Sequence, residues 1–195
     1  MNILKIVILG PESTGKSTLC KQLAQHYNSS WCAEFAREYL LQHGTSYTYD
    51  DLLTIAKGQV ALEEECIKSI VNSSGFGVKN TSGSRLQTSG SKFLFIDTDM
   101  HVMKVWCEFV FGKCHPWILN QVAERKYDLY LLCNTDLPWV KDELREYPDL
   151  QTRETLYHMY KDLMINQSTP WAEISGGYEE RLQKAIDAVD RLLAG

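Results

Sequence analysis

The sequence predicts an α/β fold in which a parallel β-sheet carries helices on both faces, within a single domain spanning residues 1–195. Short apolar runs alternate with segments whose apolar residues recur at helical spacing, as in a series of β-α units. The 195 residues are 44% hydrophobic, which is enough for one sizeable core. Positions 10–17 read GPESTGKS and match G-x-x-x-x-G-K-[ST], the pattern of a phosphate-binding loop or P-loop.

The P-loop has the flanking elements that its chemistry requires. A nearly unbroken apolar run over 3–9 predicts a buried strand, and apolar residues at i+4 spacing predict a helix that begins within the motif. Glycines let backbone N–H groups close around phosphate oxygens, and the helix N-terminus adds partial positive charge. Lys16 is expected to reach the β- and γ-phosphates of ATP, and the Ser17 hydroxyl to hold Mg²⁺. The predicted nucleotide-binding residues of the loop are Gly10, Glu12, Ser13, Thr14, Gly15, Lys16, Ser17 and Thr18.

The later elements follow the same alternation. A short segment over 29–35 predicts a second strand that ends near Glu34, and further strands are predicted at 93–96, 127–133 and 170–175. Thr48 and Asp51 have the spacing of a capping box, which predicts that a long helix opens there and ends near residue 72. Other helices are predicted over 37–42, 100–110 and 151–164, from about 115, and along an apolar stripe from Leu182 to Leu193.

An insert over 72–91 differs in composition from the rest of the chain. It is dominated by Ser, Gly, Thr and Asn, and its only charged residues are Lys79 and Arg85. Such a segment cannot bury enough apolar surface to offset the entropy of ordering it, so a flexible surface loop is expected, with a functional lid as the alternative.

Charge and cysteine usage limit the function classes. A formal net charge of -5 gives no electrostatic reason to expect nucleic acid as the main partner. The six cysteines form no C-x-x-C pair and show no zinc-ligand spacing, which favours buried thiols in a reducing compartment. Neither a secretory signal nor a membrane-spanning run is recognisable, so we expect a soluble cytoplasmic protein.

Acidic residues at strand ends are the main candidates for chemistry, because ligands of open α/β sheets bind beyond the carboxyl ends of the strands. Asp97 follows four apolar residues, as a Walker B carboxylate does, and is predicted to hold Mg²⁺ opposite Ser17; the alternative is a helix N-cap. Thr98 stands where many motor ATPases have Glu, which favours a kinase. Glu34 is then the candidate general base, or else a solvated loop carboxylate. Asp99 either binds a ribose hydroxyl or caps a helix.

Cations for the transferring phosphoryl group are expected from a polar segment after the fourth strand. Arg145 and Arg153 lie there, either as lid arginines or in surface ion pairs. None of the five histidines shows metal-ligand spacing. The predicted catalytic residues are therefore Lys16, Glu34, Asp97 and Arg145, with Arg153 as a further nucleotide-binding residue.

Taken together, these motifs resemble the ribosylnicotinamide kinase domain of the NadR family, P-loop kinases that phosphorylate nicotinamide riboside. The resemblance covers nearly the whole chain. It rests on GPESTGKSTL at 10–19, EFAREY at 34–39, FIDTD at 95–99, YDLYLL at 127–132 and PWVKDELR at 138–145, with smaller matches at Tyr49-Asp50, Gly58-Gln59, His115-Pro116, Tyr178 and Arg181. It implies a nucleoside-kinase-like fold with a five-stranded parallel core, ATP as donor and a small-molecule nucleoside as acceptor. It also implies that Glu34, Arg37, Asp97 and Asp99 face that acceptor.

One departure from the family concerns the acceptor. Family members have Trp immediately before the Glu of the EFARE-like motif, whereas this chain has Ala33 there and Trp31 two residues earlier. Two such positions share a face of a strand, so Trp31 is the candidate to stack on the acceptor ring. Tyr39, Trp106 and Trp117 also lie on segments that could approach the acceptor. The second hypothesis is a regulatory protein that binds a nucleotide at its P-loop with little or no kinase activity.

Overall fold

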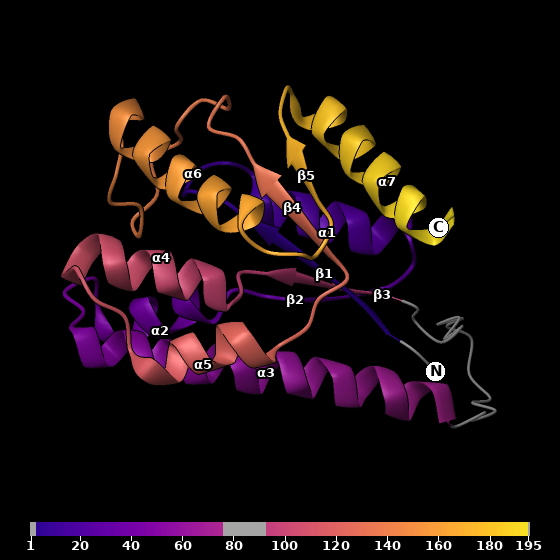
Figure 1. The fold of residues 1–195 in the computed structure, drawn as a ribbon, viewed down its shortest axis with the longest axis horizontal. Helices are drawn as coiled ribbons and strands as arrows, with labels where there is room; N and C mark the ends of the chain where they lie inside the picture. Colours follow the sequence, from indigo (N-terminus) through magenta and orange to yellow (C-terminus); the bar gives the residue numbers. More distant parts are fainter. Residues whose placement is uncertain (1–2, 76–92, 195) are drawn as a thin grey trace.

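The computed structural model describes residues 3–75 and 93–194 and contains the expected parallel sheet (Figure 1). Its five strands lie in the order β2-β3-β1-β4-β5, so the strand that precedes the P-loop is central. Ile6 to Leu9 of that strand are fully buried, as expected for a strand covered on both faces. The strands are β1 (Leu4–Leu9), β2 (Ser30–Cys32), β3 (Phe93–Asp97), β4 (Leu129–Cys133) and β5 (Trp171–Ile174).

Helices cover both faces of the sheet (Figure 1). Helices α1 and α7 pack on one face, α3, α4 and α6 pack on the other, and α2 and α5 pack beside α3 and α4. Among the described residues, no helix has both the length and the apolar character needed to cross a membrane. The helices are α1 (Lys16–His26), α2 (Phe35–His43), α3 (Tyr49–Gly75), α4 (Met100–Phe111), α5 (Pro116–Glu124), α6 (Leu150–Ile165) and α7 (Tyr178–Ala194).

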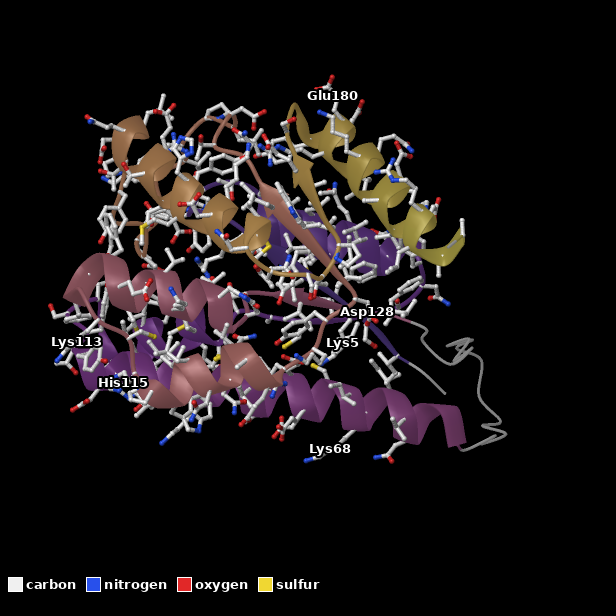
Figure 2. The ribbon with its side chains drawn as sticks, viewed as in Figure 1. Lys5, Lys68, Lys113, His115, Asp128 and Glu180 are labelled. Atoms are coloured by element: carbon white, nitrogen blue, oxygen red, sulfur yellow. The ribbon has the colours of Figure 1, made fainter. Side chains whose placement is uncertain are left out.

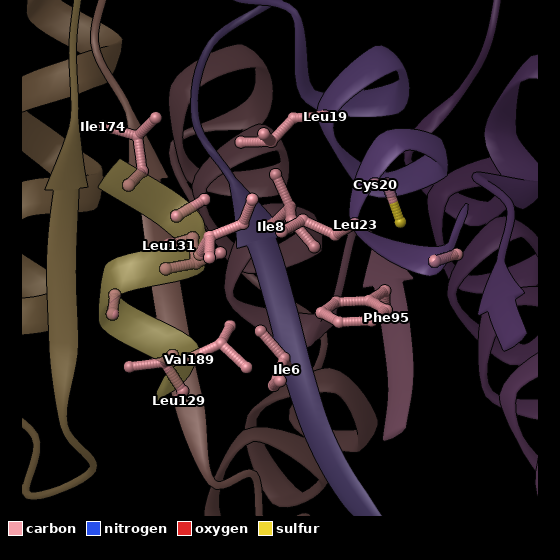
Figure 3. Close-up of a cluster of buried hydrophobic side chains, with 14 of the residues drawn as sticks. Ile6, Ile8, Leu19, Cys20, Leu23, Phe95, Leu129, Leu131, Ile174 and Val189 are labelled. Atoms are coloured by element: carbon pink, nitrogen blue, oxygen red, sulfur yellow. The ribbon is translucent and has the colours of Figure 1, made fainter. Parts of the chain in front are cut away.

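The core on the α1 and α7 face is built from alternate strand residues. Ile6 and Ile8 of β1 lie beside Phe95 of β3 and Leu131 of β4, and Leu23 of α1 closes over them (Figure 3). The intervening strand residues, Val7 and Leu9 among them, belong to the core on the opposite face. This two-sided burial fixes the register that places the carboxyl ends of β1, β3 and β4 at one edge.

Local signals account for several helix boundaries. The capping box is present, because the Thr48 hydroxyl accepts the Asp51 N–H at 3.3 Å while the Asp51 carboxylate accepts the Thr48 N–H at 2.7 Å. Asp149 caps α6 by accepting the Thr152 N–H at 2.7 Å. Gly112 ends α4 with a positive φ of 65°.

Several boundaries differ from the sequence prediction by a few residues; α2, for example, begins at Phe35 rather than 37, and β4 begins at Leu129 rather than 127. The second strand ends at Cys32 rather than near Glu34, because Glu34 is already the N-cap of α2. The long helix extends past residue 72 to Gly75. The predicted insert over 72–91 lies, from residue 76 onward, outside the described residues.

A charged cluster joins α3 to the amino ends of β1 and β4. The Lys5 N–H, near the start of β1, donates to the carboxylate of Asp128, which immediately precedes β4, at 2.7 Å (Figure 2). Glu63 of α3 is 2% exposed and pairs with Arg125 at 2.9 Å, while the Tyr127 hydroxyl donates to its other oxygen at 3.0 Å. These contacts hold the long helix against the edge of the sheet opposite the P-loop.

Candidate functional site

The P-loop connects the central strand to α1 through backbone that only small residues permit. A Cβ at Gly10, where φ is 138°, would lie 2.6 Å from the carbonyl oxygen of Cys133. Gly15 is the N-cap of α1 at a φ of 79° and has no side chain to cap the helix. The first N–H groups of α1 therefore border the cavity described below, where an anion would satisfy them.

The Thr14 hydroxyl and the Lys16 ammonium both point back to the backbone of the loop. Thr14 Oγ1 donates to the Pro11 carbonyl oxygen at 2.7 Å, and Lys16 Nζ donates to the same oxygen at 2.8 Å. The Lys16 ammonium thus lies over the loop itself, at the place where its motif predicts phosphate oxygens.

Asp97 is brought to the P-loop by the register of the sheet. Ile8 pairs with Asp97 across β1 and β3, so the carboxylate lies just before the turn at Gly10. Asp97 is 1% exposed, and its Oδ1 has no hydrogen-bond partner in the described part of the chain. Burial and the neighbouring charge of Glu34 raise its pKa to about 6, although Lys16 and Ser17 act in the opposite direction.

A divalent cation fits this arrangement. A buried carboxylate oxygen without a partner next to the hydroxyl of Ser17 offers the hard oxygen ligands that Mg²⁺ prefers. Among the described residues, no group of three or more His, Cys, Asp or Glu side chains is placed to hold a metal ion. This donor set suits an ion that completes its shell with water and phosphate oxygens.

Glu34 faces the same space from the other side. As the N-cap of α2 it makes no side-chain cap hydrogen bond, and its carboxylate instead lines the cavity. Thr98 Oγ1 donates to Glu34 Oε1 at 3.4 Å, which links the carboxylate to the residue after Asp97. Thr98 holds a φ of 82°, an unusual value for a β-branched residue that turns the chain sharply after β3.

One cavity of about 240 Å³ runs from the P-loop into an apolar chamber. The P-loop end is lined by residues 10–18, and Glu34, Arg37 and Arg145 also line the cavity. The chamber is walled mainly by apolar and aromatic side chains from three helices, α2, α4 and α6, and from the segment before α6. These are Ala36, Leu40, Val102, Trp106, Phe109, Leu144, Tyr147, Leu156 and Tyr160, with Glu146 at the wall.

The segment over 138–147 closes over the P-loop through Glu12. The Glu12 carboxylate accepts the backbone N–H of Tyr147 at 2.6 Å and of Glu146 at 3.0 Å, and the indole N–H of Trp139 at 3.4 Å. Ser13 Oγ accepts the Val140 N–H at 2.9 Å. Two side chains predicted to bind nucleotide therefore hold this segment in place.

Arginines from the predicted set reach the cavity by different routes. Arg145 lines the cavity and donates to the carbonyl oxygen of Val140 within its own segment. Arg37 also lines it, and its guanidinium forms a two-bond pair with Asp142 at 3.2 and 3.1 Å. Arg37 thereby connects α2 to the segment over the P-loop.

Trp31 does not join the cavity. Its side chain packs with the core on the α1 and α7 face, with Lys21 Nζ 5.0 Å from its ring centroid. This placement disagrees with the expectation that Trp31 stacks on the acceptor. The strand ends at Cys32, so the alternation of side chains along it does not continue to the cavity. Tyr39 and Trp117 also lie elsewhere, whereas Trp106 lines the chamber.

Asp99 acts as a helix cap in this structure. It is 1% exposed, accepts the N–H groups of His101 and Val102 at 3.1 and 3.3 Å, and pairs with the His101 ring at 2.7 Å. Of the two alternatives that the sequence left open for Asp99, the contacts match the cap. Arg153 is 4% exposed on α6, and its Nε and Nη1 have no partner among the described residues.

Sequence reasoning missed most of the chamber wall. Val102, Trp106 and Phe109 recur at i+4 and i+7 on α4, a spacing that is equally typical of a core-facing stripe. Arg181 was noted only as part of a resemblance, yet it donates to the carbonyl oxygens of Thr14, Asn134 and Gly176 at 3.0, 2.9 and 2.8 Å. It therefore ties the P-loop to the turns after β4 and β5.

A P-loop after a central parallel strand, with a buried carboxylate at the end of the neighbouring strand, defines a P-loop nucleotide-binding protein. The model of the AAA_28 family, described as an AAA domain, matches residues 5–181, and the chain belongs to this family. The fold resembles those of a NadR protein and a thymidylate kinase of known structure.

Two curated relatives are trifunctional NAD biosynthesis/regulator proteins NadR, from Salmonella typhimurium and Escherichia coli. Each is 24% identical over 193 residues, which is 96% of this chain and 42% of the relative. The chain therefore spans less than half the length of the curated relatives it matches.

Solved structures show the same fold. A NadR protein in complex with NR superposes with a TM-score of 0.73 at 20% identity, covering 99% of this chain and 51% of that one. A NadR complex with NAD and AMP-PNP gives 0.69, also at 20% identity, covering 99% and 50%. Thymidylate kinase from Ehrlichia chaffeensis gives 0.64 at 13% identity, covering 97% and 99%.

Proposed function

We propose that this protein is an ATP-dependent kinase that transfers the γ-phosphoryl group to the 5′-hydroxyl of nicotinamide riboside. One observation carries the proposal: a single cavity joins the P-loop to Glu34 and to an aromatic chamber. A donor nucleotide and a nucleoside could thus occupy the two ends with their reacting groups between them. The kinase-like fold of the solved neighbours supports the reaction class.

In this proposal the P-loop and the arginines stabilise the transferring phosphoryl group. Lys16 and the first N–H groups of α1 hold the β- and γ-phosphates, and Arg145 adds a cation from the segment above. Arg153 is proposed as a second nucleotide-binding cation, because its buried Nε and Nη1 have no partner among the described residues, although its side chain is not part of the cavity lining. Ser17 and Asp97 would hold Mg²⁺, which neutralises charge on the phosphate oxygens when bound.

Glu34 acts as the general base. As the 5′-oxygen of the acceptor forms its bond to the γ-phosphorus, the hydroxyl proton passes to the Glu34 carboxylate. The bond between the γ-phosphorus and the bridging oxygen breaks, and ADP leaves with that electron pair. The products are a nucleoside 5′-monophosphate, ADP and a proton that Glu34 later releases to water.

The chamber suits a flat cation. Trp106, Phe109, Tyr147 and Tyr160 offer aromatic faces, and Glu146 and Glu34 add negative charge. A pyridinium ring is attracted to aromatic faces by their quadrupole and to carboxylates by charge. One NadR structure in the comparison contains NR, which supports the same acceptor for this chain.

The test is incubation of the protein with ATP, Mg²⁺ and a panel of nucleosides, with monophosphate products identified by mass spectrometry. Nicotinamide mononucleotide should be the main product. Lys16→Ala should abolish detectable transfer, and Glu34→Gln should keep ATP binding while slowing transfer by about 10²- to 10⁴-fold. ATP binding without any monophosphate would reject the kinase and favour the regulatory hypothesis.

A further inference from the structure

Gln59 of α3 holds the backbone on both sides of Glu34. Its side-chain Oε1 accepts the Phe35 N–H at 2.7 Å, and its Nε2 donates to the Ala33 carbonyl oxygen at 3.2 Å. Nε2 also lies 3.6 Å from Cys32 Sγ. Gln59 is 1% exposed, so these bonds form in the interior, where an unmatched amide is costly.

This arrangement caps the first N–H of α2 from a neighbouring helix. The Phe35 N–H is the first of α2 and has no acceptor within its own helix. The short side chains of N-cap Ser, Thr, Asp or Asn accept the N–H of the second or third helical residue, whereas the longer Glu34 side chain makes no such bond. Gln59 satisfies the Phe35 N–H from α3, while Glu34 lines the cavity and accepts from the Thr98 hydroxyl.

Gly58 sets the distance at which this contact is made. A Cβ at Gly58 would lie 2.2 Å from Cε1 of Phe35, so the Phe35 ring rests directly on the α3 backbone. Glycine within a helix costs about 1 kcal/mol relative to alanine. The close approach of α2 to α3 requires it, and that approach brings Gln59 within reach of the turn at Glu34.

We propose that Gln59 is a positioning residue for phosphoryl transfer, acting by fixing the turn that aims Glu34 at the acceptor. This inference rests on the proposed function, in which Glu34 takes the acceptor's proton. Loss of the Gln59 amide leaves the Phe35 N–H without its acceptor and the Ala33 carbonyl oxygen with only the Cys32 thiol, so the turn that carries Glu34 can shift away from the cavity. A misplacement of about 1 Å at a reacting group can cost roughly 10²-fold in rate.

The test compares Gln59→Met, which keeps the side-chain length and removes both hydrogen bonds, with Gln59→Asn, which keeps the amide and shortens its reach. Gln42→Met is the matched control, since Gln42 is exposed on α2 and bonds only Glu38, at 3.2 Å, among the described residues. Both Gln59 variants should lower kcat by about 10- to 100-fold with KM for ATP changed less than about 2-fold. The control should match the wild type.

A double-mutant cycle with Glu34→Gln separates positioning from a general loss of structure. If Gln59 acts through Glu34, Gln59→Met should cost less than about 3-fold in kcat once Glu34 is already Gln. The same fold loss in both backgrounds would overturn the proposal, as would a wild-type kcat in Gln59→Met.

Amide hydrogen exchange gives a readout that does not depend on activity. The Phe35 N–H should exchange roughly 10-fold faster or more in Gln59→Met than in Gln42→Met, since its acceptor is lost. An unchanged exchange rate would overturn the proposal that Gln59 holds the turn at Glu34. If the wild type phosphorylates no nucleoside, the proposed function fails, and the exchange rate alone decides whether Gln59 holds this turn.

Discussion

The buried carboxylate of Asp97 carries a negative charge that a bound cation would stabilise. Burial and Glu34 raise its pKa from 3.8 to about 6, so the folded protein binds this proton more tightly than the unfolded chain does. Folding therefore takes up a proton between these values, and stability falls as pH rises through that window. Above it, an ionised and incompletely paired carboxylate remains buried until a cation arrives.

The first prediction follows from this sign. In metal-free protein at pH 7.5, Asp97→Asn should raise the free energy of unfolding by about 1–3 kcal/mol, or several degrees in Tm. The gain should vanish near pH 4, where the wild-type carboxyl is protonated. Thermal unfolding in EDTA across this range measures it.

Asp149→Asn serves as a control in which the pH dependence of stability has the opposite sign. The Thr152 contacts lower the pKa of Asp149, so the stability from its charge is present at neutral pH and lost as pH falls. A gain for Asp97→Asn that is equal at every pH would contradict the explanation by burial.

Trp106 carries the second prediction at this scale. Its indole N–H donates to the Tyr47 hydroxyl at 2.7 Å, and that hydroxyl donates to Glu146 at 3.0 Å, so the ring is held beside a carboxylate. If cation–π attraction supplies about 1–2 kcal/mol, Trp106→Leu should reduce the preference for nicotinamide riboside over uridine by roughly 5- to 30-fold in kcat/KM. Trp31→Leu should leave the ratio unchanged, and an equal loss in both variants would contradict the assignment.

At the scale of helices and strands, local patterns predicted most of the architecture. The P-loop, the strand before Asp97 and the capping box at Thr48 depend on residues close in sequence, which is why their positions could be read directly. The proximity of Glu34 and Asp97 could be predicted from the sequence, because the carboxyl ends of parallel strands lie at one edge of the sheet.

The parts that sequence could not supply depend on packing between distant elements. The Gln59 side chain joins α3 to the start of α2 through hydrogen bonds to its backbone. The Glu12 carboxylate joins the P-loop to a segment more than 120 residues later. The prediction that Trp31 contacts the acceptor differs from the structure for a related reason. It assumed that the strand continues to about residue 34, whereas β2 ends at Cys32 and α2 begins at Phe35.

The third prediction concerns the segment over the P-loop. Glu12→Ala removes the acceptor for two backbone N–H groups and one indole, so the amides of Glu146 and Tyr147 should exchange with solvent roughly 10-fold faster or more. Hydrogen exchange followed by NMR measures this. Glu143→Ala, a nearby exposed carboxylate, is the control, and protected amides in Glu12→Ala would show that other contacts hold the segment.

Across the whole molecule, the two edges of the sheet have different roles. At the carboxyl edge the P-loop and Glu34 line a cavity, and Asp97 lies buried beside them with its Oδ1 unpaired among the described residues. The amino edge instead pairs its charges: Glu63 meets Arg125 at 2.9 Å and Lys5 at 3.5 Å and accepts from Tyr127. The paired buried charges and the proposed site therefore lie at opposite ends of the same strands.

The last prediction tests this separation. Glu63→Ala leaves the largely buried Arg125 guanidinium without its main partner, which typically costs about 3–5 kcal/mol when one member of a buried pair is removed. Urea unfolding should show this loss, while kcat/KM at a temperature well below the lowered Tm should stay within about 2-fold of the wild type. Lys5→Met should cost much less, because its 3.5 Å contact with Glu63 is longer and its side chain more exposed. A fall in kcat/KM that parallels the loss of stability would show instead that the amino edge and the site are energetically coupled through α3, on which Gln59 lies one turn before Glu63.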